Sequence, residues 1–228
     1  MTGGHALRCD IIFFDLDGTL VDSRQDITDA VNRTRKALGI SGEKTLSEVH
    51  SYIGGGLRET VRRAIGEAES ASSDEEQIEK ALVLFRDFYS ANPVVKTFLY
   101  PRVKKTLADM PSITKAVLTN KDRAIALDVL TGLGIKNYFS EIIGGDSERT
   151  RKPSPDGIIN TLKKYAISPE HALIVGDMDI DIITGKAAGI KTCGVTYGIG
   201  KKEDILKSEP DYIIASFGDI QKIMEETA

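Results

Sequence analysis

The sequence predicts an α/β fold whose strands run parallel in one sheet. Beyond about residue 100, short apolar runs rich in β-branched residues alternate with helical stretches, which is the pattern of βαβ units. A buried strand is also expected over residues 9–15, where four consecutive apolar residues precede two carboxylates. Because the partners of this strand lie beyond residue 100, the helical block between them is most simply an insertion.

The inserted block shows helical patterns and no strand pattern between residues 22 and 93. Glycines end two of its helices, at Gly39 and at Gly54. The last helix begins near Ser72, which can cap it, and the acids that follow suit the positive end of its dipole. The expected helices cover residues 26–38, 46–53, 57–65 and about 72–91.

The second half of the chain supplies the remaining strands and their covering helices. Pro155 falls in the first turn of one helix, and Gly134 and Gly189 close two others. Strands are expected at residues 113–118, 141–144, 172–175, 191–195 and 211–214. Helices are expected at residues 103–110, 122–133, 155–165, 180–188 and 217–226.

Length and composition limit the classes of function. A chain of 228 residues can hold a core domain and a small second domain. Its net charge of −4 and sequence pI of about 5.5 argue against a nucleic-acid or membrane partner, and no apolar run is long enough to cross a membrane. Cys9 and Cys193 stand far from any Cys/His cluster, so we expect reduced buried thiols, a cytoplasmic location and no zinc site.

Asp15 and Asp17 close the first strand and are the first candidate site residues. Side chains two apart on a strand point to the same side, and open α/β sheets bind their ligands at the carboxyl ends of strands. Two carboxylates this close are both ionised most readily beside a cation. The alternatives are that one of the two stays protonated, or that both are solvated residues of an acidic turn that caps the strand, and a bare pair of acids does not exclude these.

Polar residues follow three further strands. Thr119 and Asn120 end one, where they can donate to a phosphoryl oxygen or cap the next helix. Lys152 precedes a proline and is held extended, as a site cation or as a solvated loop residue. A third strand runs into acids at positions 177, 179 and 181, which suit Mg²⁺ or the start of a helix. For Asp179 the helix start is the favoured interpretation, and for Asp177 the metal.

These stretches resemble the four motifs of the haloacid dehalogenase-like phosphohydrolases. Residues 14–23, FDLDGTLVDS, resemble the first signature, and the second and third are matched by Thr119-Asn120 and by Lys152-Pro153. Residues 176–181 resemble the fourth, GDxxxD, with Met178 where many members carry a small polar residue. The motifs occur in the expected order and span residues 13–189.

The resemblance implies a Rossmann-like core domain of residues 1–21 and 95–228 and an inserted small helical cap domain of residues 22–94. It implies Mg²⁺ as cofactor and a chemical role for each motif residue. The implied metal ligands are Asp15, the main-chain carbonyl of Asp17, and Asp177, supported by Asp181. The implied nucleophile is Asp15, the general acid/base is Asp17, and the phosphoryl oxygens are held by Thr119, Asn120 and Lys152.

Two stretches of the chain and one arginine bear on the substrate. Residues 22–27 and 53–57 resemble those of phosphoglycolate phosphatase relatives, so the expected partner is a small phosphorylated metabolite. Arg58 would suit a second anion on it, or is simply an exposed residue at a helix start. An inorganic pyrophosphatase and a sugar-phosphate phosphatase stay open. From other classes, a phosphoacceptor signalling domain or a non-catalytic binding module also stays open, and we expect a monomer or homodimer.

Overall fold

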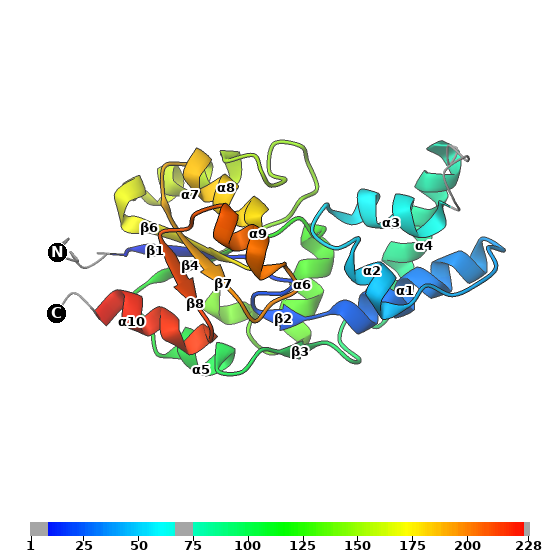
Figure 1. The fold of residues 1–228 in the computed structure, drawn as a ribbon, viewed down its shortest axis with the longest axis horizontal. Coiled ribbons are helices and arrows are strands. Elements are labelled where there is room, and N and C mark those ends of the chain that lie inside the picture. The colour runs from blue at the N-terminus through cyan, green and yellow to red at the C-terminus, as the bar shows by residue number, and fades with distance from the viewer. Residues whose placement is uncertain (1–8, 67–74, 226–228) are drawn as a thin grey trace.

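A six-stranded parallel sheet forms the centre of the molecule (Figure 1). The computed structural model describes residues 9–66 and 75–225. The strand order is β5-β4-β1-β6-β7-β8, with Phe14 of β1 paired to Val117 on one side and to Val175 on the other. The predicted α/β class is confirmed, and the predicted strand bounds agree to within two residues. The strands are β1 (Ile11–Phe14), β4 (Thr114–Leu118), β5 (Glu141–Ile143), β6 (Ala172–Gly176), β7 (Lys191–Val195) and β8 (Tyr212–Ile214).

Helices cover both faces of this sheet, so the strands are apolar on both sides. Alternate residues of β1 enter two different cores: Ile11 and Phe13 join one apolar cluster, and Ile12 and Phe14 join the other. The first face is covered by α7 (Asp156–Tyr165) and α8 (Asp179–Ala187). The second is covered by α5 (Val103–Ala108), α6 (Arg123–Gly132) and α10 (Ile220–Glu225), the last of which follows a 3-10 turn at Phe217–Asp219.

A group of four helices lies beyond the carboxyl ends of the strands (Figure 1). These helices share an apolar interior to which Val31, Val61 and Leu82 contribute. They are α1 (Arg24–Ala37), α2 (Leu46–His50), α3 (Leu57–Ile65) and α4 (Glu75–Ala91), as the helical pattern predicts. Residues 72–74, the predicted start of the last helix, lie outside the described residues. None of the described helices combines the length and apolar character that a membrane crossing needs.

Two strands and one α-helix were not predicted from the sequence, nor were the 3-10 turns at Lys136–Tyr138 and Pro169–His171. β2 (Val21–Asp22) pairs antiparallel with β3 (Phe98–Leu99), and this ribbon carries the chain into and out of the helical group. The expectation of no strand from residue 22 onward is therefore wrong at Asp22, because a two-residue strand has no readable period. The missed α-helix is α9 (Lys202–Lys207), a short helix after β7.

Asp26 joins the start of α1, which follows β2, to the segment that precedes β3. Its carboxylate is 5% exposed and accepts hydrogen bonds from the backbone N–H groups of Val95 at 3.0 Å and Thr97 at 2.8 Å, and from the Thr97 hydroxyl at 2.7 Å. Several donors on one buried carboxylate hold it firmly. The segment that returns from α4 to the sheet is thus anchored to the first turn of α1, which sets where the helical group stands above the strands.

Candidate active site

The sheet order brings the predicted site residues to one place. β1 lies between β4 and β6, so the loops that follow these three strands meet at the same edge. Asp15 follows β1 directly, and its N–H donates to Val175 O of β6 at 2.9 Å. Thr119 follows β4 in the same way, with its N–H donating to Ile143 O of β5 at 3.0 Å. Asp177 follows β6.

Lys152 bridges two buried carboxylates at this edge. Its Nζ lies 2.8 Å from Asp15 Oδ1 and 2.6 Å from Asp181 Oδ1. The lysine side chain is 3% exposed, and those of Asp15 and Asp181 are 9% and 0% exposed. Burial opposes the charged form of Lys152, but the two carboxylates outweigh it and raise the pKa of the lysine above its usual range. A buried charge cluster of this kind is typical of a functional site.

The carboxylates of Asp15, Asp177 and Asp181 form a cluster that could hold a metal ion. Each offers one oxygen, and these oxygens lie within 4.8 Å of one another. Burial and the neighbouring acids raise the pKa of Asp15 to about 7, against the opposing effect of Lys152. Burial and Asp181 likewise raise the pKa of Asp177 to about 6, against the hydrogen bonds it accepts. A hard divalent cation takes oxygen ligands and would offset this repulsion, so the donor set fits one.

Asp177 is held in place by contacts that the sequence did not predict, from the first motif and from the loop at residues 199–200. Thr19 Oγ1 donates to its Oδ1 at 3.0 Å, and the N–H groups of Ile199 and Gly200 donate to its Oδ2 at 2.8 and 2.9 Å. Gly18 has a φ of +93° and lies so close that a Cβ there would overlap the Asp177 carboxylate. The Gly-Thr pair after Asp17 was the available signal for this contact; the loop at 199–200 offered none.

Asp17 points into a different set of partners. Its Oδ1 accepts a hydrogen bond from Ser23 Oγ at 2.5 Å, and Lys121 Nζ lies 2.9 Å from Oδ1 and 2.8 Å from Oδ2. Lys121 was missed from the sequence, although it directly follows Asn120 in the second motif. Burial opposes its charge, but Asp17 raises the pKa of Lys121 above its usual range. The carboxylate of Asp17 is thus oriented by two donors and stands apart from the acidic cluster.

Asn120 joins three segments through its side chain. Its Oδ1 accepts from Lys152 N at 2.7 Å, and its Nδ2 donates to Lys152 O at 3.2 Å and to Gly54 O at 2.9 Å. The amide therefore holds the Lys152 backbone and the loop of residues 54–56 between α2 and α3, which we call the glycine loop. Thr119 is 2% exposed, and its Oγ1 accepts from Lys121 N at 3.2 Å, which leaves its hydroxyl hydrogen for another acceptor.

A cavity of about 60 Å³ lies over these residues, between the sheet edge and the helical group. Met178 lines it and packs against Gly54, where a Cβ would come within 2.6 Å of the methionine sulfur. The backbone N–H of Met178 still donates to Asp181 at 3.1 Å, so the unusual side chain does not disturb that contact. The polar lining consists of Asp15, Asp17, Thr60, Thr119, Asn120, Lys121, Asp122 and Lys152, and the apolar lining includes Ile27, Ile53, Leu57, Phe85, Ile125 and Ile180.

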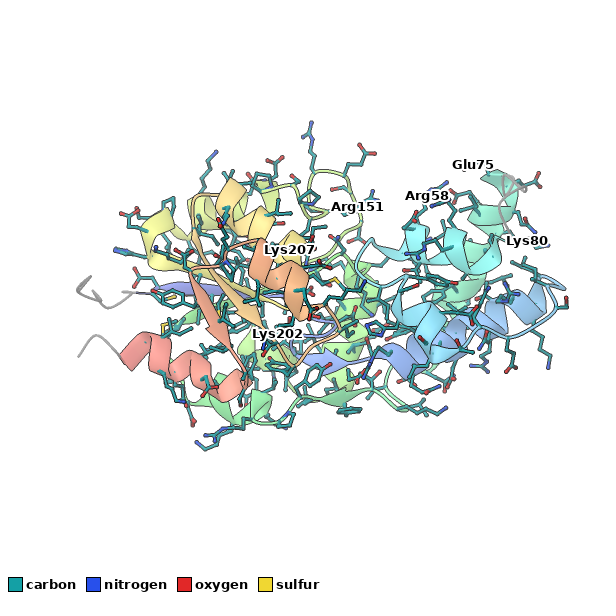
Figure 2. All side chains as sticks on the ribbon, in the orientation of Figure 1. Arg58, Glu75, Lys80, Arg151, Lys202 and Lys207 are labelled. Carbon is teal, nitrogen blue, oxygen red and sulfur yellow. The ribbon has the colours of Figure 1, made fainter. Side chains whose placement is uncertain are left out.

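Arg58 is not brought to this cavity. It forms ion pairs with Glu75 and with Glu79, the latter at 2.5 Å, and Figure 2 shows Arg58 and Glu75 on the same side of the helical group. Asp179 is exposed and is the first residue of α8, as the helix-start interpretation predicts. The remaining predicted residues, Asp15, Asp17, Thr119, Asn120 and Lys152, line the cavity, and Asp177 and Asp181 join Asp15 in the acidic cluster.

Comparisons with known proteins agree with this geometry. The family model described as "Haloacid dehalogenase-like hydrolase" matches residues 12–195. The chain is 38% identical over 217 residues to a phosphoglycolate phosphatase of Aquifex aeolicus, covering 94% of this chain and 96% of that one. It is 36% identical over 218 residues to one of Vibrio vulnificus, covering 94% and 95%.

A solved structure shares the fold over nearly the whole chain. The crystal structure of a predicted phosphoglycolate phosphatase from Haemophilus somnus has a TM-score of 0.86 and 32% identity, covering 95% of this chain and 98% of that one. Matches of this extent, with the motif residues meeting at one sheet edge, show the family. The chain therefore belongs to the haloacid dehalogenase-like hydrolases and is an enzyme of the phosphoric monoester hydrolase class.

Proposed function

We propose that this protein is a Mg²⁺-dependent phosphatase that hydrolyses a small phosphate monoester through an aspartyl-phosphate, with phosphoglycolate as the first candidate substrate. The observation that carries the proposal is the buried Asp15 carboxylate, which lines the cavity beside Lys152 and belongs to the acidic cluster. A carboxylate can attack a phosphate dianion only where the charge on both is offset. Lys152 offers one such charge, and the clustered oxygens suit a metal ion as another.

The proposed metal ligands are Asp15, Asp177 and the main-chain carbonyl of Asp17. When bound, Mg²⁺ supplies positive charge against the phosphoryl oxygens. The contacts of Asp177 with Thr19, Ile199 and Gly200 keep its carboxylate oriented before the metal arrives. Asp181 accepts from Lys152, and it thereby holds the ammonium next to the nucleophile.

The protein side chains carry the two chemical steps. Asp15 forms a bond to phosphorus while the ester oxygen leaves with a proton from Asp17. Asp17 then takes a proton from the water that hydrolyses the aspartyl-phosphate. Lys152 and the Thr119 hydroxyl bind the phosphoryl oxygens as their charge develops, and Asn120 keeps the Lys152 backbone in place.

We further propose that residues 22–94 act as a cap over a core of residues 1–21 and 95–228. Ile53, Leu57 and Phe85 of the helical group form apolar walls of the cavity. The glycine loop contacts the sheet edge that carries the site, because the Asn120 side-chain amide donates a hydrogen bond to Gly54 O. A helical wall of this kind keeps bulk water away from the phosphoryl group, which strengthens each electrostatic contact there.

The substrate assignment rests on relatives. The relatives above are named phosphoglycolate phosphatases. The sugar-phosphate and pyrophosphate activities are therefore the second candidates. Family membership disfavours the signalling and binding-module alternatives.

A screen of phosphate esters with Mg²⁺ tests this assignment. We expect kcat/KM for phosphoglycolate to exceed that for sugar phosphates and pyrophosphate by about tenfold or more, because the apolar walls at Ile53, Leu57 and Phe85 leave added polar groups without partners. The measurement is phosphate release at initial rate, with para-nitrophenyl phosphate as a generic ester. Equal rates on sugar phosphates would contradict the substrate, and no release from any ester would contradict the phosphatase.

Mg²⁺ is expected to stabilise the folded protein more strongly at high pH than at low pH. The pKa values of about 7 for Asp15 and about 6 for Asp177 exceed the roughly 4 of an unfolded aspartate, so the folded state holds these protons more tightly. Without metal, the stability that these protons bring is complete below about pH 4 and is lost as the pH rises through about 6 to 7. Mg²⁺ binds the ionised carboxylates, so protons compete with it.

The corresponding measurement is the midpoint of thermal unfolding, with and without metal. Millimolar Mg²⁺ should raise Tm by about 5 to 10 °C at about pH 8 and by much less at about pH 5. The comparison starts from EDTA-treated protein, with sodium chloride at matched ionic strength as the control. The same increase at both pH values would show that the titrating carboxylates are not the ligands.

A cytoplasmic location belongs to the same proposal. Cys9 and Cys193 are both free; Cys193 is buried as predicted, whereas Cys9 is only half-buried. Partial burial still raises the pKa of the Cys9 thiol to about 12, so the thiolate form is disfavoured. Two inert thiols suit a reducing compartment. A monomer or homodimer remains the prediction for the assembly.

A further inference from the structure

We propose that Lys121 binds the second anionic group of the substrate, the carboxylate that lies beyond the ester oxygen. The proposal rests on the phosphatase function above and assigns the residue that selects the leaving group. Nothing in the motif pattern marks Lys121 for this role. The contacts of Lys121 with Asp17 and Tyr89, and its place in the cavity wall, carry it.

The supply of positive charge at the cavity is small. Of the described residues that line it, Lys121 and Lys152 are the cationic ones. Lys152 is shared between Asp15 and Asp181 and is needed at the phosphoryl group. A doubly anionic substrate must therefore place its second charge near Lys121 or leave it without a cationic partner, which is costly.

Lys121 also lies on the correct side of the reacting bond. Asp17 protonates the leaving oxygen, so the leaving group begins beside Asp17, and Lys121 Nζ is 2.8 Å from that carboxylate. In phosphoglycolate the carboxylate is only two bonds beyond the ester oxygen. The two lysines thus divide the substrate between them, with Lys152 at the phosphoryl end and Lys121 at the leaving end.

The ammonium of Lys121 is fixed before substrate binds. Its side chain is 9% exposed, and Nζ lies 4.9 Å from the ring centroid of Tyr89, a residue of α4 that is 1% exposed. An ammonium held over an aromatic face and out of water interacts strongly with an incoming anion. Because Tyr89 belongs to the helical group, this charge depends on the group standing where the structure places it.

Two arginines near the cavity are the competing receptors. Arg58 is exposed, pairs with Glu75 and Glu79, and does not line the cavity. Arg151 approaches the glycine loop, since its Cδ is 3.7 Å from where a Cβ on Gly56 would lie, but it does not line the cavity. Arg58 and Arg151 (Figure 2) therefore serve as matched controls for substitution of Lys121.

The test compares two esters that differ at one group. Hydroxyethyl phosphate has the carbon chain of phosphoglycolate with a hydroxymethyl group in place of the carboxylate. Lys121→Gln keeps a hydrogen-bond donor for Asp17 and removes the charge. We expect the wild-type preference in kcat/KM for phosphoglycolate over hydroxyethyl phosphate to fall about 10- to 100-fold in this variant. Arg58→Met and Arg151→Met should keep the preference.

A binding measurement without turnover separates contact from catalysis. Phosphonopropionate carries the carboxylate and propylphosphonate lacks it, and calorimetry with Mg²⁺ gives the affinity of each. The preference for phosphonopropionate should be present in wild type, lost in Lys121→Gln and retained in both arginine variants. Thermal unfolding of each variant shows whether it is folded.

Each other outcome overturns the assignment. An equal loss on both esters in Lys121→Gln, with the preference intact, would mean that the lysine only orients Asp17. Loss of the preference in an arginine variant would move the receptor there, and a wild type without preference would remove the receptor altogether. In all these cases hydrolysis of para-nitrophenyl phosphate by wild type still upholds the phosphatase, so the two proposals fail separately.

Discussion

Asp15→Asn is expected to lower kcat about 10⁴-fold or more while the protein stays folded. An amide has the size of the carboxyl but cannot form the acyl-phosphate bond, so no later step can proceed. The side chain is buried among two other acids, and removal of one negative charge there does not unbalance the site. Initial rates with phosphoglycolate and para-nitrophenyl phosphate give the effect, and thermal unfolding confirms the fold.

Asp179→Asn is the matched control for this variant. Asp179 is a carboxylate at the same sheet edge, but it is exposed, and its Oδ1 accepts only a local bond from Ile180 N at 2.8 Å. We expect its turnover to stay within about twofold of wild type, because a solvated surface charge changes little. Mg²⁺-dependent hydrolysis by Asp15→Asn at the rate of the control would refute the nucleophile assignment.

Lys152→Met should cost both activity and stability. Among the described residues, the Lys152 ammonium is the cation that pairs with both Asp15 and Asp181, so its loss leaves two buried carboxylates facing each other. Breaking a buried pair in this way costs about 3–5 kcal/mol of unfolding free energy, and loss of a phosphoryl contact lowers kcat about 10²- to 10³-fold. The destabilisation should be largest near about pH 8 and should shrink toward about pH 5, as Asp15 takes up a proton.

Urea unfolding of three variants separates charge from packing. Lys164→Met removes an exposed lysine that pairs with Glu141 and should cost less than about 1 kcal/mol. The double variant Lys152→Met with Asp181→Asn removes one of the unpaired carboxylates and should recover at least about 1 kcal/mol relative to Lys152→Met alone. If the double variant were less stable than the single one, the cost would lie in packing and not in unpaired charge.

The strands and most helices were predictable because their signals are local. Residues 172–175 are apolar throughout and end at Gly176-Asp177, which predicts a doubly covered strand and its end. The β2–β3 ribbon was not predictable, since each strand has two residues and its partner is far away in the chain. α9 was missed for a different reason: its six residues hold a single buried side chain, Ile205, so no helical period of apolar residues can be read.

The candidate site was predictable where its residues end strands. Parallel strands align their carboxyl ends, so Asp15, Thr119 and Asp177 had to meet once the sheet order was known. Lys121 gave no such signal, because its position in the site is defined by contacts with Asp17 and Tyr89, which are far away in the chain. Arg58 shows the converse: a cation at a suitable place in the sequence is drawn away by Glu75 and Glu79 of α4.

By itself the sequence determined the fold class, the inserted helical block and the side chains that end each strand, because hydrophobic period and turn residues act over a few positions. Only the tertiary structure decided which charges pair. Lys152 lies between Asp15 and Asp181, and Lys121 is joined to Asp17. Pairing depends on distances between segments far apart in the chain, and burial makes each of these distances count, since a charge removed from water must find a partner.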